Sequence, residues 1–213
     1  TGATECLIKH GIPLMRSDRF SPAKKFMGLM HLSQYLVQPM ILLIFLLTPV
    51  LVLGNMFNEI PDLRVVGVFG TIPPLIMAIS QVELYRSEGL KRMLYFPLQS
   101  MVGAGIVLSN SRAVLQAFHK PGVEREFKRT PKFRIMGESQ NWLSSNYTLK
   151  IDMLTIGELI LAAYAFFGFI IALEDAIWVA PYLLIYTLSF GSFAIWNILQ
   201  NWRLQQQARR TSS

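Results

Sequence analysis

Four long apolar runs, with Glu158 as their only charged residue, dominate the sequence. They cover residues 35–53, 65–82, 153–173 and 176–199. A helix needs about 20 apolar residues to cross a hydrocarbon core of about 30 Å. Charged residues make up only 15% of the chain, against about 25% in soluble domains. The sequence therefore predicts an all-α integral membrane protein with four transmembrane helices.

The basic residues indicate which parts of the chain share one side of the membrane. If only the four runs cross, every Lys and Arg except Arg64 falls on one side, within residues 9–25, 86–150 and 203–210. Basic loops favour the cytoplasm, so we expect both termini to be cytoplasmic at a bacterial-type inner or plasma membrane. The net charge of +7 suits contact with the lipid bilayer rather than nucleic acid, because the basic residues are spread between apolar runs.

One further apolar segment, residues 93–109, is short and is interrupted by Pro97, Gly103 and Gly105. A fifth span here would carry the basic stretch 112–150 across the membrane, against the charge rule. We therefore expect an interfacial or re-entrant segment, which is tolerated where protein or water covers its backbone. The alternative is a fifth transmembrane helix.

An amphipathic helix is also expected over residues 22–33. Phe26, Leu29 and Met30 share one face of it, and Ser21 is a typical start signal. We expect this helix to lie in the headgroup region; the alternative is an ordinary solvated helix. The chain then divides into five parts. Residues 1–33 form an interfacial region and residues 34–83 a transmembrane hairpin. Residues 84–150 form a cytoplasmic region with an interfacial or re-entrant helix and a basic loop, residues 151–200 a second hairpin, and residues 201–213 a cytoplasmic tail.

The basic loop, residues 126–132 (EFKRTPK), combines cations with one aromatic ring and one hydroxyl group. Lys and Arg neutralise phosphate charge, and a Thr hydroxyl donates a hydrogen bond to it. The loop therefore suits a phosphate-rich ligand. The alternative is an ordinary cytoplasmic loop that touches anionic lipid.

Two stretches resemble the membrane domain of family 2 glycosyltransferases, the cellulose- and mannan-synthase-like enzymes. NSRAVLQAF at 110–118 followed by EFKRTPK is similar to their interfacial helix and gating loop, whose pattern Phe-x-x-Thr-x-Lys is matched by Phe127, Thr130 and Lys132. HLSQYL at 31–36 is similar to the entry into the span that follows their catalytic domain. The resemblance extends over nearly the whole chain through the order of its elements.

The resemblance implies a gating loop in which Phe127, Thr130 and Lys132 clamp a nucleotide diphosphate, with Arg129 assisting. It also implies a catalytic domain that is missing from this chain, since the Asp-x-Asp and Gln-x-x-Arg-Trp motifs are absent and residues 1–5 (TGATE) resemble the helix just after the second motif. No cofactor is expected in this chain; the parent enzyme would use a divalent metal with its nucleotide-sugar. Three aromatic residues of the last span could then line a sugar channel: Trp178, Tyr182 and Tyr186.

Two other functions stay open. The chain could be a non-catalytic integral membrane subunit of a larger photosynthetic or respiratory complex, derived from such a domain, or a fragment of a transporter or flippase. Whether it belongs to an enzyme is uncertain from its own residues, because none of them forms a catalytic set. Glu158 is either a functional carboxylate inside the membrane or a side chain that reaches headgroup water.

Overall fold

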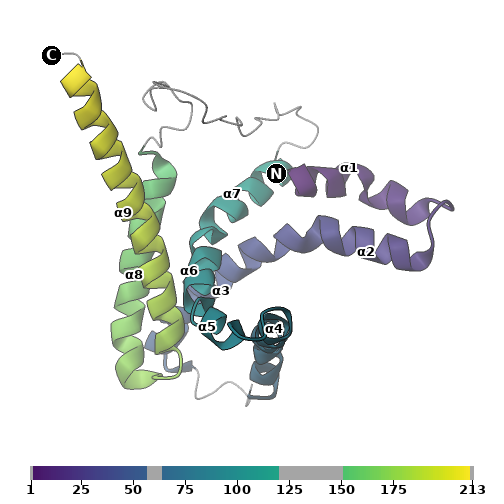
Figure 1. Ribbon diagram of the computed structural model, residues 1–213, viewed down its shortest axis with the longest axis horizontal. Coiled ribbons are helices and arrows are strands. Elements are labelled where there is room, and N and C mark those ends of the chain that lie inside the picture. The colour runs from purple at the N-terminus through teal and green to yellow at the C-terminus, as the bar shows by residue number, and fades with distance from the viewer. Residues whose placement is uncertain (1, 57–63, 120–150, 212–213) are drawn as a thin grey trace. The chain divides into compact units, whose positions relative to one another are not determined.

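The structure is a computed structural model that describes residues 2–56, 64–119 and 151–211. All the regular elements in these ranges are helices (Figure 1), which confirms the all-α prediction. The elements are α1 (Gly2–Arg16), α2 (Pro22–Ser33), the 3₁₀ turn η1 (Gln34–Leu36), α3 (Val37–Leu53), α4 (Arg64–Leu84), α5 (Gly89–Met93), α6 (Phe96–Gly105), α7 (Val107–His119), α8 (Met153–Asp175) and α9 (Ala180–Thr211).

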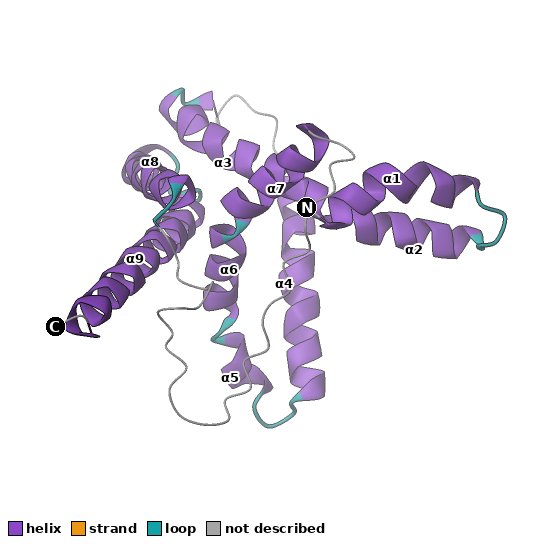
Figure 2. Cartoon of the chain, turned by 90° about the horizontal axis from the view of Figure 1, so that it is seen from above, coloured by secondary structure: helices purple, strands orange, loops and turns teal. Residues whose placement is uncertain are grey.

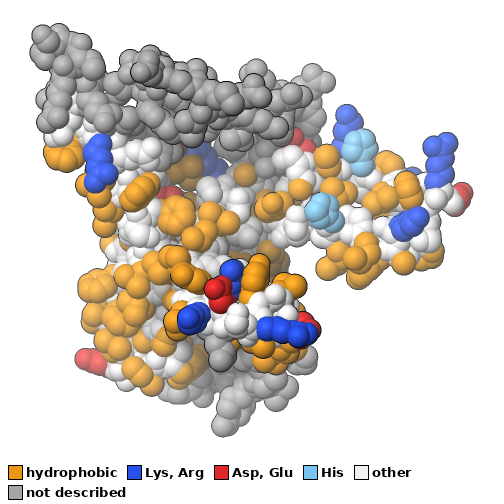
Figure 3. Space-filling view, viewed as in Figure 1, with side chains coloured by type: hydrophobic (Ala, Val, Ile, Leu, Met, Phe, Trp, Pro, Cys, Tyr) orange, Lys and Arg blue, Asp and Glu red, His pale blue; other side chains and the backbone are white. Residues whose placement is uncertain are grey.

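Three helical stretches are long and apolar enough to cross a membrane, judged by length and composition. They are Pro22–Leu53, which joins α2, η1 and α3, then Met153–Asp175 and Ala180–Arg203. They contain the first and third predicted spans and most of the fourth, and they indicate an integral membrane protein. Hydrophobic side chains cover much of the face seen in Figure 3. Examples on these stretches that are more than half exposed are Met40, Ile44, Ile160 and Phe167. Such exposure suits lipid better than water.

The second predicted span falls on α4, which has 21 residues. At a rise of 1.5 Å per residue its length is about 31 Å, close to the thickness of a hydrocarbon core. Its C-terminal part, Leu75–Leu84, is an apolar helix. Leu75, Ile76 and Ile79 are each more than half exposed there, so the described part of α4 presents the apolar surface that a lipid-facing helix needs.

The segment at 93–109 is broken into short helices rather than one long one. None of α5, α6 and α7 has more than 13 residues, which corresponds to about 20 Å. Pro97 lies at the start of α6, and α6 ends at Gly105. No single helix between Gly89 and His119 is therefore long enough to cross, and the interfacial or re-entrant position of this segment stays a prediction.

The predicted helix over 22–33 coincides with α2. Ser21 has an extended backbone (φ −64°, ψ 155°) and Pro22 occupies the first turn, where a missing N–H costs nothing. Helices α1 and α2 form an antiparallel pair (Figures 1 and 2). A Cβ on Gly28 would lie 3.1 Å from Leu14 Cδ2, so the absence of a side chain there lets the two helices approach closely.

The predicted boundaries around the last span were wrong. The predicted runs 153–173 and 176–199 leave only Glu174 and Asp175 for the turn, but α8 includes both, and the turn covers residues 176–179. Pro181 explains the shift, because proline is favoured in the first turn of a helix, and α9 begins at Ala180. The tail beyond residue 200 is also helical as far as Thr211, because Gln, Arg, Leu and Ala propagate a helix well.

The chain divides into two compact units. Unit 1 consists of Thr1–Leu42, Val107–Ile156 and Ala194–Ser213, and unit 2 consists of Leu43–Ile106 and Gly157–Phe193. In unit 1, α7 contacts both α1 and η1. In unit 2, α8 and α9 pack on α3 around a core of aromatic side chains.

Candidate functional site

The four residues predicted to hold a nucleotide diphosphate, Phe127, Arg129, Thr130 and Lys132, lie outside the described residues, in the chain between α7 and α8. Their role therefore stays a prediction. The described part of unit 1 contains a different candidate, a polar cavity that sequence reasoning missed.

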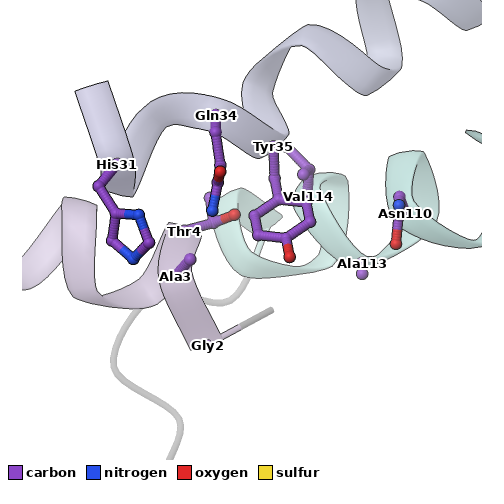
Figure 4. A pocket seen from close by; sticks show the side chains of 9 residues that line it. All are labelled: Gly2, Ala3, Thr4, His31, Gln34, Tyr35, Asn110, Ala113 and Val114. Atoms are coloured by element: carbon purple, nitrogen blue, oxygen red, sulfur yellow. The ribbon is translucent and has the colours of Figure 1, made fainter. Parts of the chain in front are cut away.

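The polar cavity has a volume of about 450 Å³ and lies between the first turn of α1, the junction of α2 with η1, and α7 (Figure 4). Residues from all three elements line it: Gly2, Ala3, Thr4, His31, Gln34, Tyr35, Asn110, Ala113 and Val114. Glycine and alanine contribute three of these nine positions. Because these residues have little or no side chain, they leave space between the helices.

Helical spacing brings the lining side chains together within each element. Gln34 and Tyr35 follow His31 by three and four residues, so the three side chains share one face where α2 passes into η1. Ala113 and Val114 follow Asn110 by the same spacing on α7. Figure 4 shows Gln34 reaching down from η1 toward Thr4, with the rings of His31 and Tyr35 on either side of it.

The cavity is rich in hydrogen-bonding groups that carry no full charge. Two amides and two hydroxyl groups line it, together with the His31 ring, and none of the described lining residues is Asp, Glu, Lys or Arg. Thr4 is only 1% exposed, whereas Gln34 and Tyr35 are open to solvent. Among the described residues, no hydrogen bond engages the side chains of Gln34, Tyr35 or Asn110. The described residues therefore leave these groups open to a ligand.

Unit 2 holds an aromatic cluster consisting of Phe45, Tyr164, Tyr182, Tyr186 and Phe190. Phe45 lies at its centre, 0% exposed, and stacks on Tyr186 with ring centroids 4.5 Å apart and planes 19° apart. The Tyr164 hydroxyl donates a hydrogen bond to the carbonyl oxygen of Leu46, one turn before Pro49. Partner groups of this kind satisfy backbone carbonyls near a proline in a membrane helix.

The three predicted channel residues have different surroundings. Tyr186 is buried, 5% exposed, and packs on Phe45. Tyr182 is half-buried, and its ring centroid lies 4.8 Å from that of Tyr186. Trp178 lies in the turn between α8 and α9 and is 67% exposed. Tyr186 therefore contributes to packing in this structure, and the channel role of all three residues stays a prediction.

Glu158 is covered by protein, with 6% of its surface exposed, on the second turn of α8. This burial favours the interpretation of an intramembrane carboxylate over a side chain that reaches outward to headgroup water. Within the described residues, no group of three His, Cys, Asp or Glu side chains forms a candidate metal site.

Comparison with known proteins gives no relative. No protein-family description matches the chain, and neither the curated proteins nor the solved structures contain a significant match. The fold alone therefore defines the class, an all-helical integral membrane protein with three candidate spans in its described part.

Proposed function

We propose that this chain is the membrane portion of a family 2 glycosyltransferase, which moves a hexose from a nucleotide-sugar to a polysaccharide or lipid acceptor. One observation carries the proposal. The segments that resemble the family outside the basic loop are TGATE at 1–5, HLSQYL at 31–36 and NSRAVLQAF at 110–118, and described residues of all three meet at the polar cavity. Segments that are distant in the sequence thus share one site.

The proposed arrangement in the membrane has four spans. Helices α3, α8 and α9 supply three of them, and α4 supplies the fourth, since its length matches the hydrocarbon core. Both termini and the basic loop then lie on the cytoplasmic side. A catalytic domain preceding residue 1 would approach α1 from that side and would hold the nucleotide-sugar with its divalent metal.

In this proposal the basic loop closes over the nucleotide. Lys132 and Arg129 neutralise the diphosphate, the Thr130 hydroxyl donates a hydrogen bond to it, and Phe127 covers the bound group. Stabilising the diphosphate as a leaving group favours glycosyl transfer, because negative charge develops there as the glycosidic bond to the donor breaks.

Replacing Lys132 by Ala should weaken the binding of UDP or GDP to the full-length protein in lipid nanodiscs by about ten- to a hundredfold. A charge-assisted hydrogen bond contributes about 1.5–3 kcal/mol, and each 1.4 kcal/mol corresponds to a factor of ten in Kd. The measurement is a calorimetric titration with each nucleotide. Lys150→Ala is the control, because it removes a cation from the same stretch between α7 and α8 but outside the Phe-x-x-Thr-x-Lys pattern. Equal affinities for the two variants would remove the clamp from the proposal.

The second candidate function is a non-catalytic subunit of a larger membrane complex. Such a subunit needs neither Asp-x-Asp nor Gln-x-x-Arg-Trp, and the 213 residues contain neither motif. Intact-mass measurement of the protein purified from its native membrane separates the two functions. A mass well above 24.2 kDa supports the enzyme, whereas a mass near that value, with larger partners copurifying, supports the subunit.

A further inference from the structure

We propose that the polar cavity between α1, η1 and α7 binds an uncharged hexosyl unit, either of a glycan chain or of a glycolipid headgroup. The inference rests on the proposed function, because an acceptor sugar is a substrate of a glycosyltransferase. The proposed function gives the cavity residues no role of their own. The site consists of Thr4, His31, Gln34, Tyr35 and Asn110.

The size and openness of the cavity suit a small polar ligand. Its volume of about 450 Å³ lies within the range of about 300–1,000 Å³ that is usual for ligand sites. Gln34 and Tyr35 are exposed, so the cavity is open to solvent. The buried Thr4 hydroxyl lies deeper in the wall, with 1% of the residue exposed. A ligand can therefore enter without displacing a helix.

The lining distinguishes a sugar from an anion. Each sugar hydroxyl both donates and accepts hydrogen bonds, and the amides of Gln34 and Asn110 together with the hydroxyls of Thr4 and Tyr35 do the same. A phosphate or carboxylate site usually contains Lys or Arg, and the described residues of the lining include neither. The Tyr35 ring, 41% exposed, adds an amphipathic surface on which the apolar face of a sugar ring can pack.

The position of the cavity fits an acceptor on its way into the membrane. Tyr35 lies in η1, immediately before α3, and α3 belongs to the first candidate span. A sugar bound to Gln34 and Tyr35 is therefore held where the chain enters the apolar region. A growing glycan and a glycolipid headgroup both meet this description, and they share the same hydroxyl chemistry.

The test uses the full-length protein in nanodiscs and three probes, namely cellotetraose, mannotetraose and nanodiscs that contain glucosyl-diacylglycerol. Binding of the soluble probes is followed by saturation-transfer NMR and titration, and glycolipid retention by lipid analysis. We expect Gln34→Ala and Asn110→Ala each to weaken binding of the favoured probe about tenfold. Gln116→Ala, an exposed amide on α7 outside the lining, should change it less than about twofold.

A further variant keeps every hydrogen-bonding group of the site. It keeps the proposal testable if Gln34→Ala or Asn110→Ala fails to fold. Ala113→Leu fills the cavity from α7 and should abolish sugar binding while thermal unfolding stays cooperative. If the variants lose binding of cellotetraose or mannotetraose, the ligand is a glycan. If they lose only retention of glucosyl-diacylglycerol, the ligand is a glycolipid headgroup. Unchanged binding of all probes in Gln34→Ala and Ala113→Leu would overturn the cavity proposal.

Nucleotide binding is measured in the same variants, so that the two proposals can fail separately. UDP binding that depends on Lys132, with sugar binding indifferent to the cavity variants, leaves the proposed function in place and removes the sugar site. Sugar binding that depends on the cavity, without any nucleotide binding, supports the site and contradicts the glycosyltransferase. If neither nucleotide binding nor sugar binding changes in any of these variants, both the proposed function and the sugar site are contradicted.

Discussion

Phe45→Ala should lower the free energy of unfolding by about 2–3 kcal/mol, the largest effect that we expect from a single substitution outside the functional sites. Phe45 is 0% exposed and is the ring on which the aromatic cluster of unit 2 is built. Its centroid lies 4.5 Å from that of Tyr186, 5.6 Å from Phe190 and 6.0 Å from Tyr164. One substitution therefore removes three ring contacts that join α3, α8 and α9.

The expected magnitude reflects the membrane environment. In soluble proteins Phe→Ala in a core costs about 3–5 kcal/mol, part of which is transfer of the ring from water. Helices that separate within lipid leave the ring in apolar surroundings, so that this transfer contribution largely disappears. The remaining cost has two parts. A cavity of about 100 Å³ costs about 24 cal/mol per Å³, and the edge-to-face and stacked ring contacts are lost as well.

The measurement is reversible unfolding in mixed micelles of dodecyl maltoside and sodium dodecyl sulfate. Phe167→Ala on α8 is the matched control, because that ring is 56% exposed and its removal leaves no internal cavity. We expect a change below about 0.5 kcal/mol for the control. A loss for Phe45→Ala no greater than for Phe167→Ala would show that the aromatic cluster does not hold α3 against α8 and α9.

Gly168→Ala should lower the free energy of unfolding by about 1–3 kcal/mol, although it adds only a methyl group. A Cβ at residue 168 would lie 2.7 Å from Cγ and 2.8 Å from Cβ of Pro49, and 3.3 Å from Leu183 Cδ1. Pro49 is fully buried, and its ring has no rotamer by which it could move aside. Helices α3 and α8 must therefore separate slightly, which weakens a contact of the close kind that small residues allow in membrane proteins.

The same substitution at a second helical glycine is the control. A Cβ on Gly191 of α9 would meet only Ala162 Cβ, at 4.0 Å, which is an ordinary contact distance. Alanine is favoured over glycine inside a helix by up to about 1 kcal/mol, so Gly191→Ala should be neutral or stabilising in the same unfolding assay. Destabilisation of equal size at both positions would mean that helix flexibility, rather than contact with Pro49, determines the effect at residue 168.

Residue patterns along the chain predicted the long apolar helices and α2, but not the extent of α1, the helical tail beyond residue 200 or the places where the helices meet. The start of α2 after Ser21 follows from a local rule, since an extended residue before a proline is a common helix start. The spans follow from composition alone, because lipid excludes charge. The end of α8 and the start of α9 lie a few residues beyond their predicted positions, because the acidic pair at 174–175 is helical and Pro181 lies in the first turn of α9.

The polar cavity could not be predicted, because Thr4, Gln34 and Asn110 come from segments that are separated by up to about a hundred residues. Each residue taken alone is an ordinary polar side chain near the end of a helix. The signal that was present was the spacing of His31, Gln34 and Tyr35, which places them on one face. The aromatic cluster was also partly visible, since Tyr182 and Tyr186 are four residues apart, but Phe45 as its centre depends on how α3 packs in three dimensions.

The central claim is that the basic loop shares the cytoplasmic side with both termini, and cysteine labelling in intact cells tests it most directly. Native Cys6 is exposed and reports on the N-terminal side; it is replaced by Ser when Glu59→Cys and Glu126→Cys are introduced one at a time. A membrane-impermeant maleimide should label position 59 in intact cells, and positions 6 and 126 only after permeabilisation. Labelling of position 126 in intact cells would contradict the topology, the gating loop and the proposed function together.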